Sequence, residues 1–121
     1  MACSSRDREL STLAVDRFHA QLETERYAEV YVEADEEFKK AGSEEELVRL
    51  LKSVNEKLGK VRVAHLSGYR VIVNPKGTYV MLSYDTEFTT GRATEQFTWH
   101  IMDGVAALLN YNINSPNMVN K

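Results

Sequence analysis

The sequence contains one cysteine, Cys3, so no disulfide can form within a chain. It also lacks an apolar run of the roughly 18 residues that a membrane-spanning helix needs. The formal net charge is −3 and no basic patch is present, which argues against nucleic acid as a partner. These absences leave a self-contained core as the source of stability, and 121 residues suffice to bury one without disulfides or metals.

Motifs for catalysis and metal binding are equally scarce. The sequence has no glycine-rich phosphate loop and no nucleophile elbow. Its three histidines, His19, His65 and His100, fall in separate segments without paired spacing. We therefore expect no metal site and no cofactor. His100 alternates in step with polar neighbours and is expected to face solvent.

Three stretches in the first half of the chain have the apolar period of amphipathic helices. Residues 7–22 and 25–42 each carry one apolar stripe, and Gly42 ends the second stretch. Ser43 and Glu46 have capping-box spacing and open a third helix that ends at Gly59. The stripe of the first helix is Leu10, Leu13, Ala14, Phe18 and Leu22, and that of the third is Leu47, Leu50, Leu51, Val54 and Leu58.

After Gly59 the apolar period falls from about 3.6 to 2, which indicates strands. Turn signals at Asn74–Gly77, Thr90–Gly91 and Asp103–Gly104 divide this half into four strands. The sequence therefore predicts an α+β fold, with three N-terminal helices packed on a curved four-stranded antiparallel meander. We expect a tether at 1–6, a single domain at 7–115 and a fraying tail at 116–121.

A two-residue loop at Thr90–Gly91 sets the register of the two central strands. Leu82 is then expected opposite Trp99, and Tyr84 opposite Phe97. Thr86 is expected opposite Glu95. The face covered by the helices is expected to carry Val80, Leu82, Tyr84, Phe97, Trp99 and Ile101.

The outer strands leave alternatives open. The Asn74–Gly77 turn pairs Val73 with Thr78, which puts Val71 and Tyr69 on the covered face and His65 near Glu95. A bulge at Gly68 would instead turn His65 outward. In the last strand, Ala106 and Leu108 should face the core, and a bulge near Asn110 would bring in Tyr111 and Ile113.

The sequence resembles the nuclear transport factor 2-like superfamily, whose cystatin-like fold is a cone of helices packed into a bent antiparallel sheet. The resemblance rests on TERYAEVY in the helices and on YVMLSYDTEF, ATEQFTWHIMDG and LLNYNINS in the strands. It is nearest to small bacterial domains of unknown function found in envelope lipoproteins. The superfamily includes isomerase-like and dehydratase-like enzymes as well as members that only bind or scaffold, so fold does not settle function.

An isomerase-like site would need a carboxylate base in an apolar cone and a hydrogen-bond donor for the oxyanion. Glu95 is the candidate base, with Tyr84 or His65 as its partner. The aromatic set Tyr69, Tyr84, Phe97 and Trp99 either lines a cavity for a small apolar ligand or forms ordinary core.

The junction Ala2–Cys3, followed by polar residues, resembles the point at which a bacterial lipoprotein receives its lipid. We therefore expect a protein of the cell envelope that meets the membrane only through an anchor at Cys3. The alternative is a cytoplasmic protein with an unremarkable N-terminal cysteine.

An apolar patch is expected at one end of the sheet face that the helices leave open. It comprises Tyr79, Met81, Met102, Val105, Ala107 and Leu109. A homodimer through this patch is expected, unless Met118 and Val119 of the tail fold back over it. The function most consistent with the sequence is a non-enzymatic envelope module that binds a partner protein or a small apolar ligand. The alternatives are a small cone-fold enzyme and a cytoplasmic dimerising accessory domain.

Overall fold

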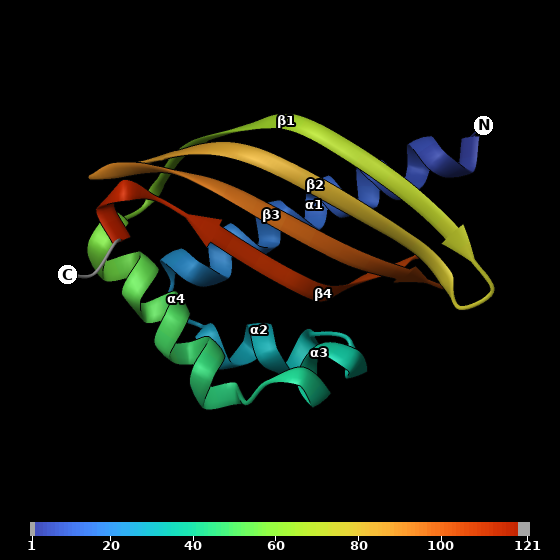
Figure 1. The fold of residues 1–121 in the computed structure, drawn as a ribbon, viewed down its shortest axis with the longest axis horizontal. Helices are drawn as coiled ribbons and strands as arrows, with labels where there is room; N and C mark the ends of the chain where they lie inside the picture. The colour runs from blue at the N-terminus through green and yellow to red at the C-terminus, as the bar shows by residue number, and fades with distance from the viewer. Residues whose placement is uncertain (1, 119–121) are drawn as a thin grey trace.

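A computed structural model describes residues 2–118, and for residues 2–5 and 117 it describes the backbone alone. Helices come first in the chain and strands follow, which confirms the α+β class (Figure 1). The helices are α1 (Ala2–Glu23), α2 (Tyr27–Glu33), α3 (Glu36–Ala41) and α4 (Glu44–Leu58). The strands are β1 (Val61–Asn74), β2 (Gly77–Phe88), β3 (Gly91–Met102) and β4 (Val105–Asn114), and a short 3-10 helix, η1 (Pro116–Met118), follows.

The four strands form one antiparallel sheet in the order β1-β2-β3-β4, as the sequence predicts. Asp103 and Gly104 both have positive φ, 52° and 75°, and Met102 lies directly opposite Val105. These values are those of a type I′ hairpin turn, which suits the twist of the two strands it joins. The sheet arches over the helices, which lie against one of its faces (Figure 1).

The expected register between β2 and β3 is wrong by two residues. Leu82 lies opposite Phe97, and Tyr84 lies opposite Glu95. The turn falls at Thr89–Thr90, because its residues bind the end of α4: the Thr90 amide donates to the carbonyl of Leu58. A shift of two residues keeps every side chain on its expected face, so the covered face is as predicted.

Three register shifts adjust the outer strands, at Arg62 and Ser67 in β1 and at Leu109 in β4. Ser67 is the extra residue between Leu66 and Gly68, one position before the expected bulge, and it turns His65 to the open face opposite Asp85. In β4, Leu109 is the extra residue, because Thr98 pairs with Asn110 while Trp99 pairs with Leu108. A bulge reverses the alternation of the side chains beyond it. Tyr111 is therefore buried on the same side as Leu108.

The second expected helix is broken into α2 and α3 at Ala34–Asp35. Asp35 caps α3, since its carboxylate accepts a hydrogen bond from the Glu37 amide. Its own amide donates to the carbonyl of Leu108 on the outer edge of β4. The break thus lets this segment cover one edge of the sheet. The third expected helix is correct, because α4 begins with the Ser43–Glu46 capping box.

The buried stripe of α1 differs from the expected one. Ser11, Val15, Phe18 and Leu22 are buried at steps of four, three and four, whereas Leu13 is exposed. His19 is buried on the same face. Residues 2–6, expected as a tether, fall within the bounds of α1.

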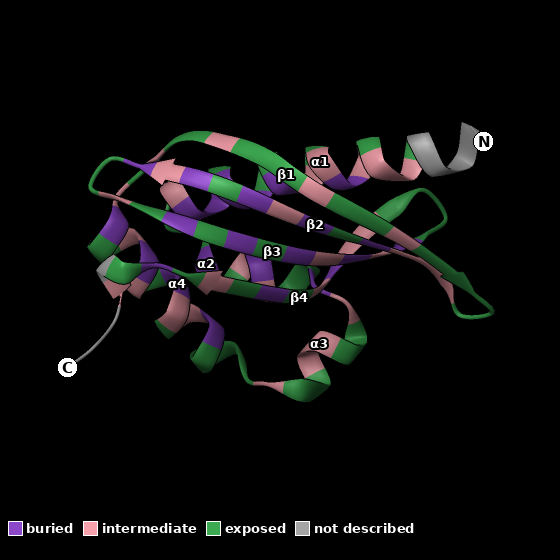
Figure 2. Ribbon diagram, turned by 45° about the horizontal axis from the view of Figure 1, so that its top comes forward, coloured by how far each residue is buried: buried purple, intermediate pink, exposed green. Residues whose placement is uncertain are grey.

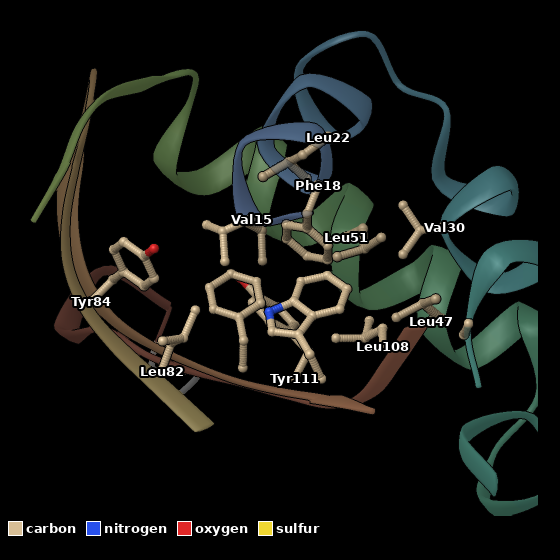
Figure 3. Packing of buried hydrophobic residues seen from close by; sticks show 14 of the residues in the cluster. Val15, Phe18, Leu22, Val30, Leu47, Leu51, Leu82, Tyr84, Leu108 and Tyr111 are labelled. Atoms are coloured by element: carbon tan, nitrogen blue, oxygen red, sulfur yellow. The ribbon is translucent and has the colours of Figure 1, made fainter. Parts of the chain in front are cut away.

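The core lies between α1, α2 and α4 on one side and the covered face of the sheet on the other. Figure 3 shows Val15 and Phe18 reaching from α1 toward Leu82 and Leu108 of the sheet. Met118 of η1 also packs against this core, so it does not fold back over the open face. Val119 lies outside the described residues.

The open face is apolar at one end and polar at the other, as expected. Met81, Met102 and Val105 of the apolar patch are 39%, 53% and 63% exposed. The sequence register places Met81 opposite His100 and Tyr79 opposite Met102, and both pairs are wrong by two residues. Tyr79 lies opposite His100, with the two rings stacked at 4.6 Å, and Met81 lies opposite Thr98. His100 is half-buried rather than fully exposed, because Asp35 holds its Nδ1 at 2.8 Å.

Figure 2 shows that β1 is exposed or half-buried along its whole length, whereas β2 and β3 carry many buried residues.

Trp99 provides a test of this packing. Its side chain is 5% exposed, so we expect Trp99→Ala to lower the free energy of unfolding by about 3–5 kcal/mol. Urea denaturation followed by circular dichroism measures the change. Met102→Ala, on the open face of the same strand, is the control and should cost less than about 1 kcal/mol. Equal midpoints for parent and Trp99→Ala would show that the tryptophan is not part of the core.

Candidate functional site

Glu95 is fully buried in the middle of β3 and forms the centre of a polar cluster. Its Oε1 lies 2.8 Å from His19 Nε2 and accepts a hydrogen bond of 2.6 Å from the Thr86 hydroxyl. Its Oε2 accepts a hydrogen bond of 2.6 Å from the Tyr111 hydroxyl. Both oxygens of the carboxylate are therefore occupied by protein donors. We call these four residues the Glu95 cluster.

Each member of the Glu95 cluster comes from a different element of the fold. His19 lies one turn after Val15 on the buried face of α1. Thr86 and Glu95 face the core from neighbouring strands, β2 and β3. Tyr111 reaches the cluster only because the Leu109 bulge brings it to the covered face of β4. The cluster thus joins the first helix to three strands at one point.

The surroundings of Glu95 hold it as a carboxylate. Burial alone would raise its pKa, but the hydrogen bond and charge of His19, with the hydrogen bonds of Thr86 and Tyr111, outweigh burial and lower the pKa below 4.5. Burial and the negative charge of Glu95 raise the pKa of Tyr111 well above 10, so Tyr111 remains a donor. Charge-assisted hydrogen bonds of this kind stabilise the ionised form of Glu95.

The closed geometry of the Glu95 cluster limits its chemistry. Glu95 has 0% exposed surface, and His19 and Tyr111 are also buried. A general base must come within hydrogen-bond reach of a substrate proton, and its pKa is best placed near neutrality. Glu95 meets neither condition, because protein donors occupy its oxygens and its pKa is lowered. In this conformation the cluster joins α1 to the sheet, and Glu95 has no exposed surface.

Of the two expected partners of Glu95, Tyr84 is its neighbour across the strands, whereas His65 lies on the opposite face of the sheet. Tyr84 lies opposite Glu95 across β2 and β3, and its ring packs edge-on against Phe97 at 5.9 Å. Burial, with the negative charges of Asp16 and Glu95, raises the pKa of Tyr84 to about 12. Its hydroxyl points to the helix side of the sheet (Figure 3). His65 is exposed on the open face, in a depression of about 390 Å³ that it shares with Asp85.

The aromatic residues expected to line a ligand cavity divide into two groups. Phe97 and Trp99 are buried and stack in parallel at 5.9 Å, and Tyr84 is buried beside them. Tyr69 is 54% exposed and lies under the guanidinium of Arg8, 4.6 Å from the ring centre. A cavity of about 50 Å³ borders Trp99, which is room for water rather than for a ligand. Among the described residues, the Trp99 Nε1 donor has no acceptor.

Metal-binding groups do not gather in the described part of the chain. Within residues 2–118, no three side chains of histidine, cysteine, aspartate or glutamate come together so that they could hold a metal ion. His19 and His100 each contact one carboxylate, Glu95 and Asp35. Cys3 has no described side chain, so its role lies outside what the structure addresses.

Two members of the Glu95 cluster were not among the candidates drawn from the sequence as partners of Glu95. His19 shares the 15-18-22 spacing of the buried face of α1, and that spacing could have placed it in the core. Leu108 and Tyr111 have opposite parity in β4, so a bulge between them is needed for both to face the core. That bulge is the one sequence signal that places Tyr111 in the core. Neither pattern predicts that His19 and Tyr111 contact Glu95, because contacts between distant segments depend on how the helix packs on the sheet.

Comparison with known proteins gives one family. The model of a family described as "Protein of unknown function (DUF4019)" matches residues 14–111. This range begins in α1 and ends at Tyr111, so it contains the whole Glu95 cluster. A search of curated proteins finds no match.

The Glu95 cluster predicts a large loss of stability for Glu95→Gln. The glutamine amide has one oxygen acceptor in place of two, and its own N–H groups face residues that already donate. We therefore expect a cost of about 3–5 kcal/mol in the free energy of unfolding. Glu87→Gln on the open face is the control and should stay within about 0.5 kcal/mol. A Glu95→Gln protein as stable as the parent would show that the cluster carries no stability.

The same cluster sets a pH dependence. The folded-state pKa of Glu95 is lowered, so its contribution is complete above the unfolded-state pKa and is lost as pH falls through the folded-state value. Between pH 5 and pH 3, the parent should therefore lose more unfolding free energy than Glu95→Gln does. Urea titrations at several pH values measure both slopes, and equal slopes would contradict the account.

Proposed function

The chain belongs to the DUF4019 family, and we propose that it is a non-enzymatic binding module of the bacterial cell envelope whose working surface is the open face of its sheet. One observation carries the proposal: the apolar patch stays exposed while the interior is filled. Met81, Met102 and Val105 are each more than a third exposed on one side of the molecule. Contiguous exposed apolar side chains of this kind mark interaction sites.

The partner that fits the patch best is a second copy of the chain. In a two-fold dimer, every charge at the centre meets its own copy, so the interface must be free of unpaired charge. The patch residues are uncharged, and the neighbouring His100 is already paired with Asp35. Arg70 of β1 lies opposite Met81 and is the charge that borders the patch. Membership of the nuclear transport factor 2-like superfamily is part of the same proposal, and helices packed on a bent four-stranded sheet support it.

A small apolar ligand is the other occupant to consider. The cavity of about 50 Å³ beside Trp99 is too small for one. The open face has a groove of about 330 Å³, lined by Met81, Gln96 and Thr98 among others. A ligand would therefore compete with the second copy for the same face, and the same substitution tests both.

A catalytic role for Glu95 is the second candidate function. The convergence of Glu95, His19 and Tyr111 favours it, since acids, bases and donors of enzymes gather in this way. The 0% exposure of Glu95 and its lowered pKa weigh against it. A ketosteroid isomerase or dehydratase assay with parent and Glu95→Gln would establish this role if only the parent turned over substrate.

The envelope location rests on Cys3 and on the resemblance of its surroundings to a lipidation junction. No helix in residues 2–118 combines the length and hydropathy that crossing a bilayer requires. Attachment through acyl chains on Cys3 would be the membrane contact in this proposal. The same domain in the cytoplasm, as a dimerising accessory module, is the alternative.

Met81→Glu tests the open face. A glutamate in the middle of a two-fold interface faces its own copy, so the substitution should shift a dimer to monomer. Light scattering coupled to size exclusion measures the mass. Gln96→Glu, an isosteric change toward the polar end of the same face, is the control and should leave the dimer in place. A parent chain that is monomeric at high micromolar concentration would refute the dimer.

Cys3→Ala tests the location. When the full native gene is expressed in its source bacterium, the parent should sediment with membranes and Cys3→Ala should be released or left unprocessed. Ser4→Ala is the matched control and should behave like the parent. Recovery of the parent in the soluble cytosolic fraction would contradict the lipid anchor.

A further inference from the structure

One edge strand of the sheet, β4, is covered by another segment of the chain, whereas the other edge strand, β1, is not. The outer edge of β4 is covered where the Asp35 amide donates to the carbonyl of Leu108 and α3 packs against the strand. β1 has β2 as its single neighbour in the sheet. Apart from this pairing, the described residues show one hydrogen bond from the backbone of β1 to another element, from the Val61 amide to the Glu23 carboxylate, and it lies before the Ser67 bulge. An uncovered edge presents unpaired N–H and C=O groups to any extended chain.

The second half of β1 is the part best suited to pairing. The Ser67 bulge interrupts the strand, and after it the seven residues from Gly68 to Asn74 pair with β2 without a break. Apolar side chains remain exposed here on both faces: Tyr69 by 54% and Val73 by 75% on the helix side, and Ile72 by 37% on the open face. A core strand would bury such residues, and a protected edge would replace them with charge.

The positive charges around residues 68–74 favour an acidic partner. Arg70 is exposed on the open face, Lys76 follows the strand, and Arg8 lies over the ring of Tyr69. Residues 60–76 contain no aspartate or glutamate. Glu9 is the acidic residue beside Arg8, in an open depression of about 530 Å³ next to Leu66. A second copy of β1 would bring Arg70 near Arg70, whereas an acidic strand would pair with it.

We propose that the free edge of β1 from Gly68 to Asn74 is a docking site for an extended segment of a partner protein, which adds to the sheet as a fifth strand. The segment alternates apolar and acidic residues. Its apolar side chains lie on the helix side beside Tyr69 and Val73, and its acidic side chains lie on the open-face side beside Arg70. Backbone pairing supplies affinity, and this alternation supplies specificity. On the open face the site borders the apolar patch, because Arg70 lies opposite Met81 and Ile72 lies opposite Tyr79. Pairing uses the backbone edge of β1, which the patch does not include.

Synthetic peptides test the proposal on the full chain. The probe alternates valine and glutamate, a second peptide replaces each glutamate with lysine, and a third carries a central proline that cannot pair. Fluorescence anisotropy should show binding of the glutamate peptide alone. Hydrogen exchange should slow at the amides of residues 68–74 when that peptide is bound. Equal binding of the lysine peptide, or protection confined to β3 and β4, would overturn the assignment.

Two matched variants localise the site. Arg70→Glu turns attraction into repulsion and should weaken binding of the glutamate peptide by about threefold to tenfold. Arg62→Glu makes the same change on β1 before the bulge and should alter binding less than about twofold. Equal losses in both variants would assign the effect to overall charge and overturn the site. Without peptide, hydrogen exchange at residues 68–74 that slows further as protein concentration rises would show that β1 pairs with a second copy. That result would overturn the assignment of an acidic partner.

Discussion

The buried carboxylate of Glu95 is the constraint on which the rest of the structure depends. Removing an ion from water costs several kcal/mol, and the cost is recovered only when donors surround the ion. His19, Thr86 and Tyr111 are those donors, and they come from α1, β2 and β4. The arrangement therefore fixes how α1 is rotated on the sheet, and it requires the Leu109 bulge, because without it Tyr111 would point to the open face.

The proposed function places the working surface outside the core, because the cavity beside Trp99 has a volume of only about 50 Å³ and Glu95 is fully buried. The open face keeps an exposed apolar patch, and β1 keeps an exposed edge surrounded by arginine and lysine. These surfaces differ in the partners they suit. The patch residues are uncharged, which suits the proposed second copy, whereas Arg70 at the edge suits the proposed acidic strand.

The element types and faces could be predicted from the sequence because local periods determine them. Asp103–Gly104 fixed a hairpin, and Ser43–Glu46 fixed the start of α4. The β2–β3 register differs by two residues from the one predicted with a Thr90–Gly91 turn. The turn lies at Thr89–Thr90 instead, because these residues bind the end of α4. The break at Asp35 and the meeting of His19 with Glu95 could not be predicted. Both arise from contacts between segments far apart in the chain, and no local pattern encodes them.

The most direct test is the titration of the Glu95 carboxyl carbon by NMR in the folded parent. A structural carboxylate held by three donors should stay ionised as the pH falls through 4.5, the ordinary pKa of a glutamate, and should protonate only as the fold is lost. A general acid or base would instead titrate near neutrality without unfolding. A Glu95 pKa between 6 and 8 in the folded chain would contradict the structural account and restore catalysis as the leading function.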